Sequence, residues 1–118
     1  MGERAQIEIV QKPHSVFLYT HWGGKTVLSD TARGLLYGRD RWDDPEYLTR
    51  IIFDNLSRNA PFPTTGFGIG TCQHIDIDTL VTVNPDSYSI ECRNFSNEKT
   101  TTWSFDELIE NEGKSNGH

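Results

Sequence analysis

Residues 15–25 place a hydrophobic strand directly before a polar turn. The segment reads Ser-Val-Phe-Leu-Tyr-Thr-His-Trp-Gly-Gly-Lys. The continuous apolar stretch at 16–19 predicts a buried strand. The two glycines then allow a sharp turn or the close approach of a ligand. His21 and Trp22 each have an apolar body and a polar tip, so we expect functional side chains where this strand ends.

The residues before this segment predict a first strand. Between Ala5 and Gln11, Ile7 and Ile9 alternate with polar residues, which is the period of a half-buried strand. Residues 12–14, Lys-Pro-His, interrupt the pattern, and so short a connection favours an antiparallel hairpin. We expect the continuous apolar strand to be the more central of the two.

Two helices are predicted next. The first is expected to begin near Ser29 or Asp30 and to end at Gly38. The second has Asp44 as its N-cap and Pro45 in its first turn, and it stops at residues 59–61, Asn-Ala-Pro. Apolar residues recur along it at spacings of three and four, which predicts a buried stripe. The stripe comprises Leu48, Ile51, Ile52 and Leu56.

The second half of the chain predicts further strands and one helix. Residues 67–71 alternate a side chain with glycine, which predicts a strand whose glycine side is closely covered. Strands are also expected over residues 79–83, 88–92 and 100–102. Ser104 and Glu107 match a capping box for a helix over residues 105–111, with Trp103 and Leu108 as its hydrophobic staple. Residues 113–118 are expected to form a frayed tail.

These patterns together predict one α+β domain over residues 1–118. The expected architecture is a mostly antiparallel sheet with two helices inserted after strand two and a short C-terminal helix. A chain of 118 residues with 35% hydrophobic content can bury a core without a disulfide or a structural metal. Cys72 and Cys92 lack Cys-x-x-Cys spacing, so we expect buried free thiols and no zinc site.

The net charge of −6 lies in the second half of the chain. Residues 1–58 hold eight basic and eight acidic side chains, whereas residues 59–118 hold three basic and nine acidic ones. Duplex DNA requires a cationic footprint, so we do not expect general binding to it. The sequence still allows a local cationic pocket, because several basic residues follow the apolar strand. These are Lys25, Arg33, Arg39, Arg41, Arg50 and Arg58.

Hydropathy sets the expected location of the protein. No run approaches the roughly 18 apolar residues of a membrane span. The first residues, Met-Gly-Glu-Arg-Ala-Gln, lack the apolar stretch of a signal peptide. We therefore expect a cytoplasmic protein without membrane contact.

Four segments carry a resemblance to known sequences. They are residues 16–24, which contain Tyr-Thr-His-Trp-Gly-Gly, and residues 38–53, 65–71 and 103–107. In these segments the chain resembles a group of small uncharacterised proteins encoded by bacteriophages and bacterial genomes. The resemblance implies a counter-defence role in the host cytoplasm, by binding a host defence protein or by sequestering its nucleotide signal. Together with the 11% aromatic content, it also implies a homo-oligomer.

The turn after the apolar strand is the first candidate site. Residues 23–26, Gly-Gly-Lys-Thr, resemble the end of a P-loop, but Tyr19 stands where that motif needs its first glycine, so no nucleoside triphosphatase is expected. A looser anion site is predicted instead, with the amides of Gly23 and Gly24 and the Lys25 ammonium as donors. Trp22 would stack on a base.

The segment after the first helix extends this candidate site. Arg39 and Arg41 would add cationic donors and Trp42 a second stacking surface, if the segments at both ends of the helix converge. In the alternative, the tryptophans pack on the helices and the glycines only turn the chain. The predicted ligand-binding residues are His21, Trp22, Gly23, Gly24, Lys25, Arg39, Arg41 and Trp42.

Two other patterns carry weaker predictions. A strand over residues 74–78 would place His74, Asp76 and Asp78 on one face, where they could bind a divalent cation, although a solvated face is favoured. His21 has no nucleophile beside it in a recognisable motif, so a binding protein is favoured over an enzyme. We expect no cofactor and no bound metal.

Three functions remain in order of preference. The first is a binding protein that sequesters a small anionic nucleotide-like molecule. The second is an inhibitor that covers a host defence protein with the acidic surface of the second half. The third is a small hydrolase of a nucleotide signal, which would use His21 or the His74 segment.

Overall fold

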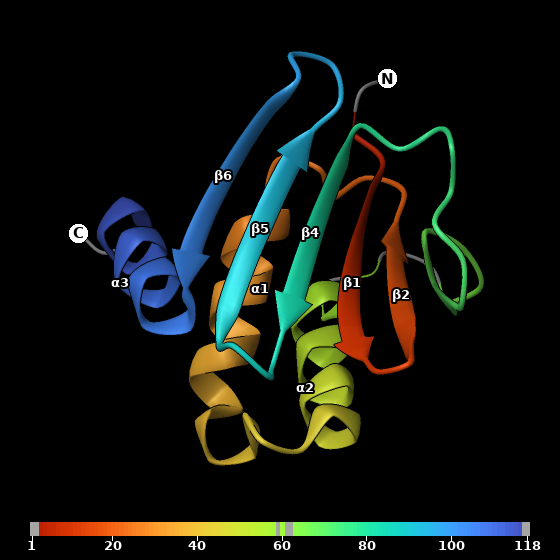
Figure 1. Cartoon of the computed structure of the whole chain (residues 1–118). Coiled ribbons are helices and arrows are strands. Elements are labelled where there is room, and N and C mark those ends of the chain that lie inside the picture. The colour runs from red at the N-terminus through yellow and green to blue at the C-terminus, as the bar shows by residue number, and fades with distance from the viewer. Residues whose placement is uncertain (1–2, 59, 61–62, 117–118) are drawn as a thin grey trace.

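Three helices lie on one face of a six-stranded sheet, as Figure 1 shows. This computed structural model describes residues 3–58, 60 and 63–116, with side chains through residue 112. The elements in chain order are β1 (Ala5–Gln11), β2 (His14–Thr20), α1 (Val27–Tyr37), the 3₁₀ helix η1 (Arg39–Arg41), α2 (Pro45–Ser57), β3 (Phe67–Gly70), β4 (Thr79–Asn84), β5 (Ser89–Asn94), β6 (Lys99–Ser104) and α3 (Phe105–Asn116).

The sheet joins two antiparallel three-stranded halves through one parallel pair. Its strand order is β3-β2-β1-β4-β5-β6, and only β1 and β4 run parallel. The predicted α+β class, with a mostly antiparallel sheet, two helices after β2 and a C-terminal helix, is confirmed. The parallel pair makes β1 the more central member of the first hairpin, so the expectation that the apolar strand would be more central is wrong.

Successive side chains of β1 and β2 lie on opposite faces of the sheet. Ile7 pairs with Leu18 and Ile9 with Val16, and these side chains belong to the core beneath the helices. The intervening residues point to the opposite face, because successive side chains of a strand alternate. There Gln6 pairs with Tyr19.

Hydrogen bonds from the Gln6 side chain hold the β3–β4 connection against that opposite face. Gln6 is 1% exposed. Its amide nitrogen donates to the Cys72 carbonyl at 3.2 Å, and its amide oxygen accepts from the His74 N–H at 2.8 Å. Ile77 from the same connection is buried in a small cluster with Phe17. Residues 74–78 therefore form a loop, and the strand considered there is absent.

The apolar stripe of α2 is confirmed at three of its four positions. Leu48, Ile52 and Leu56 are buried, whereas Ile51 is half-buried. Pro45 opens the helix as predicted, but the Asp44 side chain makes no capping hydrogen bond. Its carboxylate instead lies 3.7 Å from the Arg41 guanidinium. The helix ends at Ser57, and residues 59 and 61 of the predicted stop lie outside the described residues.

Helix α1 begins earlier than predicted. Its first residue is Val27, and Thr26 occupies the N-cap without a capping hydrogen bond from its side chain. The Thr26 carbonyl accepts the Asp30 N–H at 2.9 Å, so Asp30 lies inside the first turn and is not the cap. At the other end the Gly38 N–H closes the helix on the Gly34 carbonyl at 2.8 Å.

Two strand predictions and the predicted tail need correction. The glycine side of β3 is open, because a Cβ at Gly70 would meet nothing within 4 Å. Strand β6 covers Lys99–Ser104, which is longer than residues 100–102. Helix α3 continues to Asn116, so the backbone of residues 113–116 is helical and not a frayed tail. Residues 117–118 lie outside the described residues.

The capping box of α3 is confirmed in both directions. The Ser104 N–H donates to the Glu107 carboxylate at 2.8 Å, and the Glu107 N–H donates to the Ser104 hydroxyl at 3.1 Å. Leu108 is buried and Trp103 packs against the same core cluster. These contacts fix the direction in which α3 leaves β6.

The contact between α1 and α2 predicts an unusual effect at Gly34. A Cβ at Gly34 would lie 2.8 Å from the Ile52 Cα, so Gly34→Ala should lower the free energy of unfolding by about 1 to 3 kcal/mol. Helix propensity alone predicts the opposite sign, a gain of about 1 kcal/mol. Denaturant unfolding separates the two, with Gly70→Ala as a control in open space. A stabilised Gly34→Ala protein would contradict the close helix contact.

The capping box predicts coupling between its two members. Ser104→Ala should cost about 1 kcal/mol, because it leaves a first-turn N–H without its acceptor. Glu107→Ala should remove less stability in the Ser104→Ala background than in the unmodified protein, since the two bonds support one turn. A double-mutant cycle from thermal or denaturant unfolding measures this. Strict additivity would argue against the reciprocal box.

Candidate functional site

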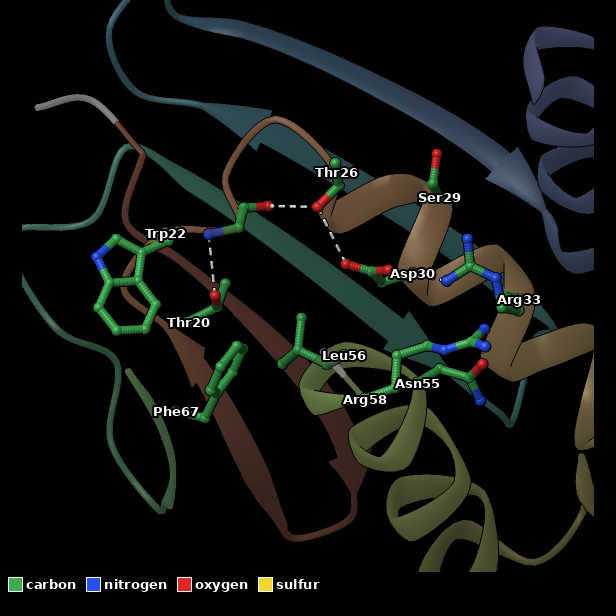
Figure 2. A pocket seen from close by; sticks show the side chains of 11 residues that line it. Thr20, Trp22, Thr26, Ser29, Asp30, Arg33, Asn55, Leu56, Arg58 and Phe67 are labelled. Atoms are coloured by element: carbon green, nitrogen blue, oxygen red, sulfur yellow. Dashed lines mark hydrogen bonds and ion pairs between the residues drawn. The ribbon is translucent and has the colours of Figure 1, made fainter. Parts of the chain in front are cut away.

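A cleft of about 480 Å³ lies where the β2–α1 turn, α1, the end of α2 and β3 meet. Figure 2 shows that its lining is divided, with Trp22 and Phe67 at one end and charged side chains at the other. Leu56 lines the space between them. The two ends differ in chemistry, so the cleft is suited to a ligand with an apolar ring and a charged group.

Two aromatic side chains form one end of the cleft. The rings of Trp22 and Phe67 meet edge to face, with centroids 6.2 Å apart. Trp22 is 42% exposed, so part of its ring remains available to a ligand. It lies over Gly66, which has a φ of +98° and where a Cβ would be 2.1 Å from the indole. A side chain at position 66 would therefore displace Trp22.

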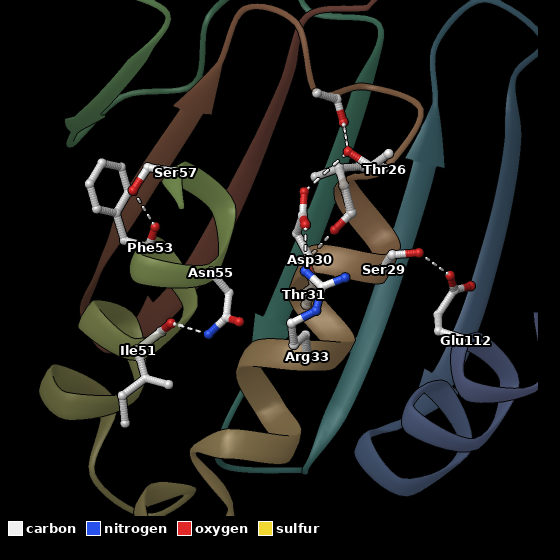
Figure 3. A network of polar contacts seen from close by, with 12 residues as sticks. Thr26, Ser29, Asp30, Thr31, Arg33, Ile51, Phe53, Asn55, Ser57 and Glu112 are labelled. Atoms are coloured by element: carbon white, nitrogen blue, oxygen red, sulfur yellow. Dashed lines mark hydrogen bonds and ion pairs between the residues drawn. The ribbon is translucent and has the colours of Figure 1, made fainter. Parts of the chain in front are cut away.

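An ion pair on α1 forms one side of the charged end. The Arg33 guanidinium donates to one Asp30 carboxylate oxygen at 3.0 Å, and the Thr26 hydroxyl donates to the other at 3.2 Å, as Figure 3 shows. Burial of the carboxylate raises the pKa of Asp30, although its hydrogen bonds to Arg33 and Thr26 act in the opposite direction. Arg33 is thus already partly neutralised.

Arg58 supplies a cation without such a partner. It is exposed at the end of α2, and it makes no ion pair with any described residue. Each of the other arginines lies 2.6–3.7 Å from a carboxylate, namely Arg4, Arg33, Arg39, Arg41, Arg50 and Arg93. Arg58 lines the cleft beside Asn55 and Leu56. The cleft therefore combines one carboxylate with two guanidinium groups.

The predicted anion cradle at the glycines is not available. Gly23 lines the cleft, but its N–H donates to the Thr20 hydroxyl at 3.0 Å. The Gly24 N–H donates to the Glu3 carbonyl at 2.7 Å. Both amides are therefore used within the protein. The Lys25 ammonium is 3.8 Å from the Glu3 carboxylate and lies outside the cleft lining.

The second predicted segment lies at the other end of α1. Helix α1 has 11 residues, which corresponds to about 16 Å along its axis. Arg39 pairs with Asp106 at 3.0 Å, and Trp42 donates its indole N–H to the Leu35 carbonyl at 2.9 Å. Arg39, Arg41 and Trp42 follow the C-terminal end of α1, whereas Trp22 precedes its N-terminal end, so they do not reach Trp22 within one chain. Trp42 packs against the core and the end of α1, as the alternative prediction for the tryptophans stated.

His21 and His74 lie beside Tyr19 of β2, outside the cleft lining. The Tyr19 hydroxyl and the His21 Nδ1 are 3.0 Å apart, and the Tyr19 and His74 rings are 4.9 Å apart between centroids. Asp76 is paired with Arg4 at 2.7 Å. Within the described residues, no group of three or more His, Cys, Asp or Glu side chains is placed to hold a metal ion. His21 does not line the cleft.

Sequence reasoning missed most of the charged end. Arg33 and Arg58 were members of a general basic segment, without a reason to select them from it. Asn55 gave a usable signal, because it is a polar residue three positions after Ile52 and next to Leu56 on the buried side of α2. Such a position predicts an amide that either binds the backbone or faces a site.

Comparisons with known proteins identify no relative of this chain. Protein-family models, curated proteins and solved structures give no match to the chain. Among the described residues, no helix has both the length and the apolar character that a membrane span needs.

The two cysteines differ in exposure, which corrects the expectation that both are buried. Cys72 is exposed, whereas Cys92 is half-buried and packs against the core. Burial raises the pKa of the Cys92 thiol, and the charge of Glu112 adds to the effect.

At pH 8, iodoacetamide should therefore modify Cys72 rapidly and Cys92 slowly, since the thiolate is the reactive form. Mass spectrometry of Cys72→Ser tests this, and rapid labelling of that variant would contradict it.

Proposed function

We propose that this protein binds a small anionic, nucleotide-like molecule in the cleft. The observation that carries the proposal is Arg58, an arginine without a carboxylate partner among the described residues, across the cleft from an exposed Trp22. A guanidinium that makes no ion pair with a described residue favours an anion, even though Asp30 lies close enough for its charge to interact with that of Arg58. An indole with an exposed face favours a flat ring. A nucleotide carries both groups on one molecule.

The size and charge of the cleft support the same ligand class. Its volume of about 480 Å³ falls within the range of about 300–1,000 Å³ that small-molecule sites occupy. Arg33 and Arg58 lie near each other in Figure 2, so both can approach one phosphate group. Guanidinium groups bind phosphate through paired hydrogen bonds. This local cationic end is compatible with a chain of net charge −6, because most of its other arginines are internally paired.

We propose binding without turnover, in keeping with a counter-defence protein that sequesters a signal. Among the described residues that line the cleft, the carboxylate of Asp30 is held by Arg33 and Thr26, and neither histidine nor cysteine is present. The groups offered to a ligand are thus cationic, aromatic and hydrogen-bonding. They support retention of an intact molecule better than its cleavage.

The proposal predicts selective loss of binding from two variants. Arg58→Ala should weaken binding of a nucleoside monophosphate by about 10- to 100-fold, because a hydrogen bond to a charged group contributes about 1.5 to 3 kcal/mol. Trp22→Ala should weaken binding through lost stacking. Calorimetric titration with nucleoside monophosphates and cyclic nucleotides measures both effects, and that of Arg58→Ala should shrink at high salt.

Arg50→Ala is the matched control for Arg58→Ala. Arg50 is an exposed arginine on the same helix, paired with Asp54 at 2.6 Å and outside the cleft lining. Its removal should leave binding unchanged. If no nucleotide in the panel binds the unmodified protein, the proposal is wrong. Bound nucleotide recovered intact supports sequestration, whereas recovery of a cleaved product would show an enzyme.

A further inference from the structure

Asn55 presents a hydrogen-bond acceptor that the protein does not use. The residue is 7% exposed, and its side-chain amide nitrogen donates to the Ile51 carbonyl at 2.9 Å. That bond fixes the direction of the amide, so the oxygen points away from the helix backbone, as Figure 3 shows. No described residue donates to this oxygen. No fully buried side-chain oxygen lacks a partner among the described residues, so the Asn55 oxygen is reached through the cleft that Asn55 lines.

Asp30 supplies a second acceptor at the same end of the cleft. Each of its oxygens accepts one hydrogen bond, from Arg33 or from Thr26, and a carboxylate oxygen can accept two. The Asp30 side chain is 14% exposed, so water solvates its charge poorly. Burial also raises the pKa of this carboxyl group, in agreement with the poor solvation of its charge. A hydroxyl group of a ligand would supply the missing donor.

These two acceptors lie beside the two cations. Figure 2 places Asp30 and Asn55 next to Arg33 and Arg58, away from the Trp22 end. An anion bound by the guanidinium groups would therefore have its neighbouring atoms next to two acceptors. In a ribonucleotide, the groups joined to the phosphate include a sugar with donor hydroxyls. A phosphate on an apolar or deoxygenated carrier offers fewer donors and leaves the acceptors without partners.

The geometry points to a cleft that selects ribonucleotides over their 2′-deoxy and 2′,3′-dideoxy analogues, with Asp30 and Asn55 accepting the sugar hydroxyls. This inference rests on the proposed binding of a nucleotide and specifies its sugar. Arg33 and Arg58 bind the phosphate, Trp22 and Phe67 contact the base, and the two acceptors contact the sugar hydroxyls next to the phosphate. Discrimination arises because a site with buried polar groups rejects an analogue that leaves them unpaired.

The test compares sugar analogues on the unmodified protein. We expect dissociation constants for the common ribonucleoside 5′-monophosphates to rise from the ribo to the 2′-deoxy to the 2′,3′-dideoxy form, by about 10-fold or more over the series. Calorimetric titration measures each step. Equal binding of all three forms would overturn this inference and leave the proposed function standing. Failure of every form to bind would overturn the proposed function itself.

Asn55→Leu assigns the selectivity to this amide. The variant removes the acceptor oxygen at similar side-chain size, and it should reduce the ribo-to-dideoxy ratio while dideoxynucleotide binding stays nearly unchanged. Ser57→Ala is the matched control, because Ser57 also donates to the carbonyl four residues earlier on α2, that of Phe53 at 2.8 Å, and lies outside the cleft lining. Full ribose preference in a folded Asn55→Leu protein would overturn the role of Asn55. If this variant does not fold, the analogue series on the unmodified protein still decides the inference.

Discussion

The close contact of Gly34 with Ile52 sets the geometry on which the cleft depends. Glycine lets the two helix backbones approach, since a Cβ would lie 2.8 Å from the Ile52 Cα. Arg33 is adjacent to this contact on α1, and Asn55 follows Ile52 by one turn of α2. The spacing between the guanidinium of one helix and the amide of the other is therefore fixed by a packing constraint. A core contact, rather than a flexible loop, positions the charged end of the cleft.

The aromatic end depends on a different kind of constraint. Trp22 follows β2 and is placed by hydrogen bonds of its neighbours, because the His21 N–H binds the Gly66 carbonyl at 2.8 Å and the Gly23 N–H binds Thr20. Gly66 has a positive φ, and its lack of a Cβ leaves room for the indole. The glycines near this site thus support an aromatic side chain. The amides of Gly23 and Gly24 already donate to Thr20 and Glu3, which explains why they do not form an anion cradle.

The secondary structure was readable from the sequence because its signals are local. Alternation marked β1, the stripe at Leu48, Ile52 and Leu56 marked α2, and Ser104 with Glu107 marked the start of α3. The parallel pairing of β1 with β4 was not readable, since no local pattern specifies which strand edges meet. Of the predicted ligand-binding residues, Trp22 and Gly23 line the candidate cleft. Arg39, Arg41 and Trp42 were assigned by nearness along the chain, whereas Arg58 reaches the cleft through helix packing.

The parallel pair also has a kinetic consequence. Ala5 pairs with Thr79, so the centre of the sheet joins residues from opposite halves of the chain. The hairpins on either side close over short connections and can form early, whereas this pairing requires a long loop to close and is expected to be slow. During synthesis from the N-terminus, β1 would emerge with one edge lacking its partner until β4 is made. For that interval β1 exposes an unpaired strand edge, and such an edge can pair with a strand of another chain.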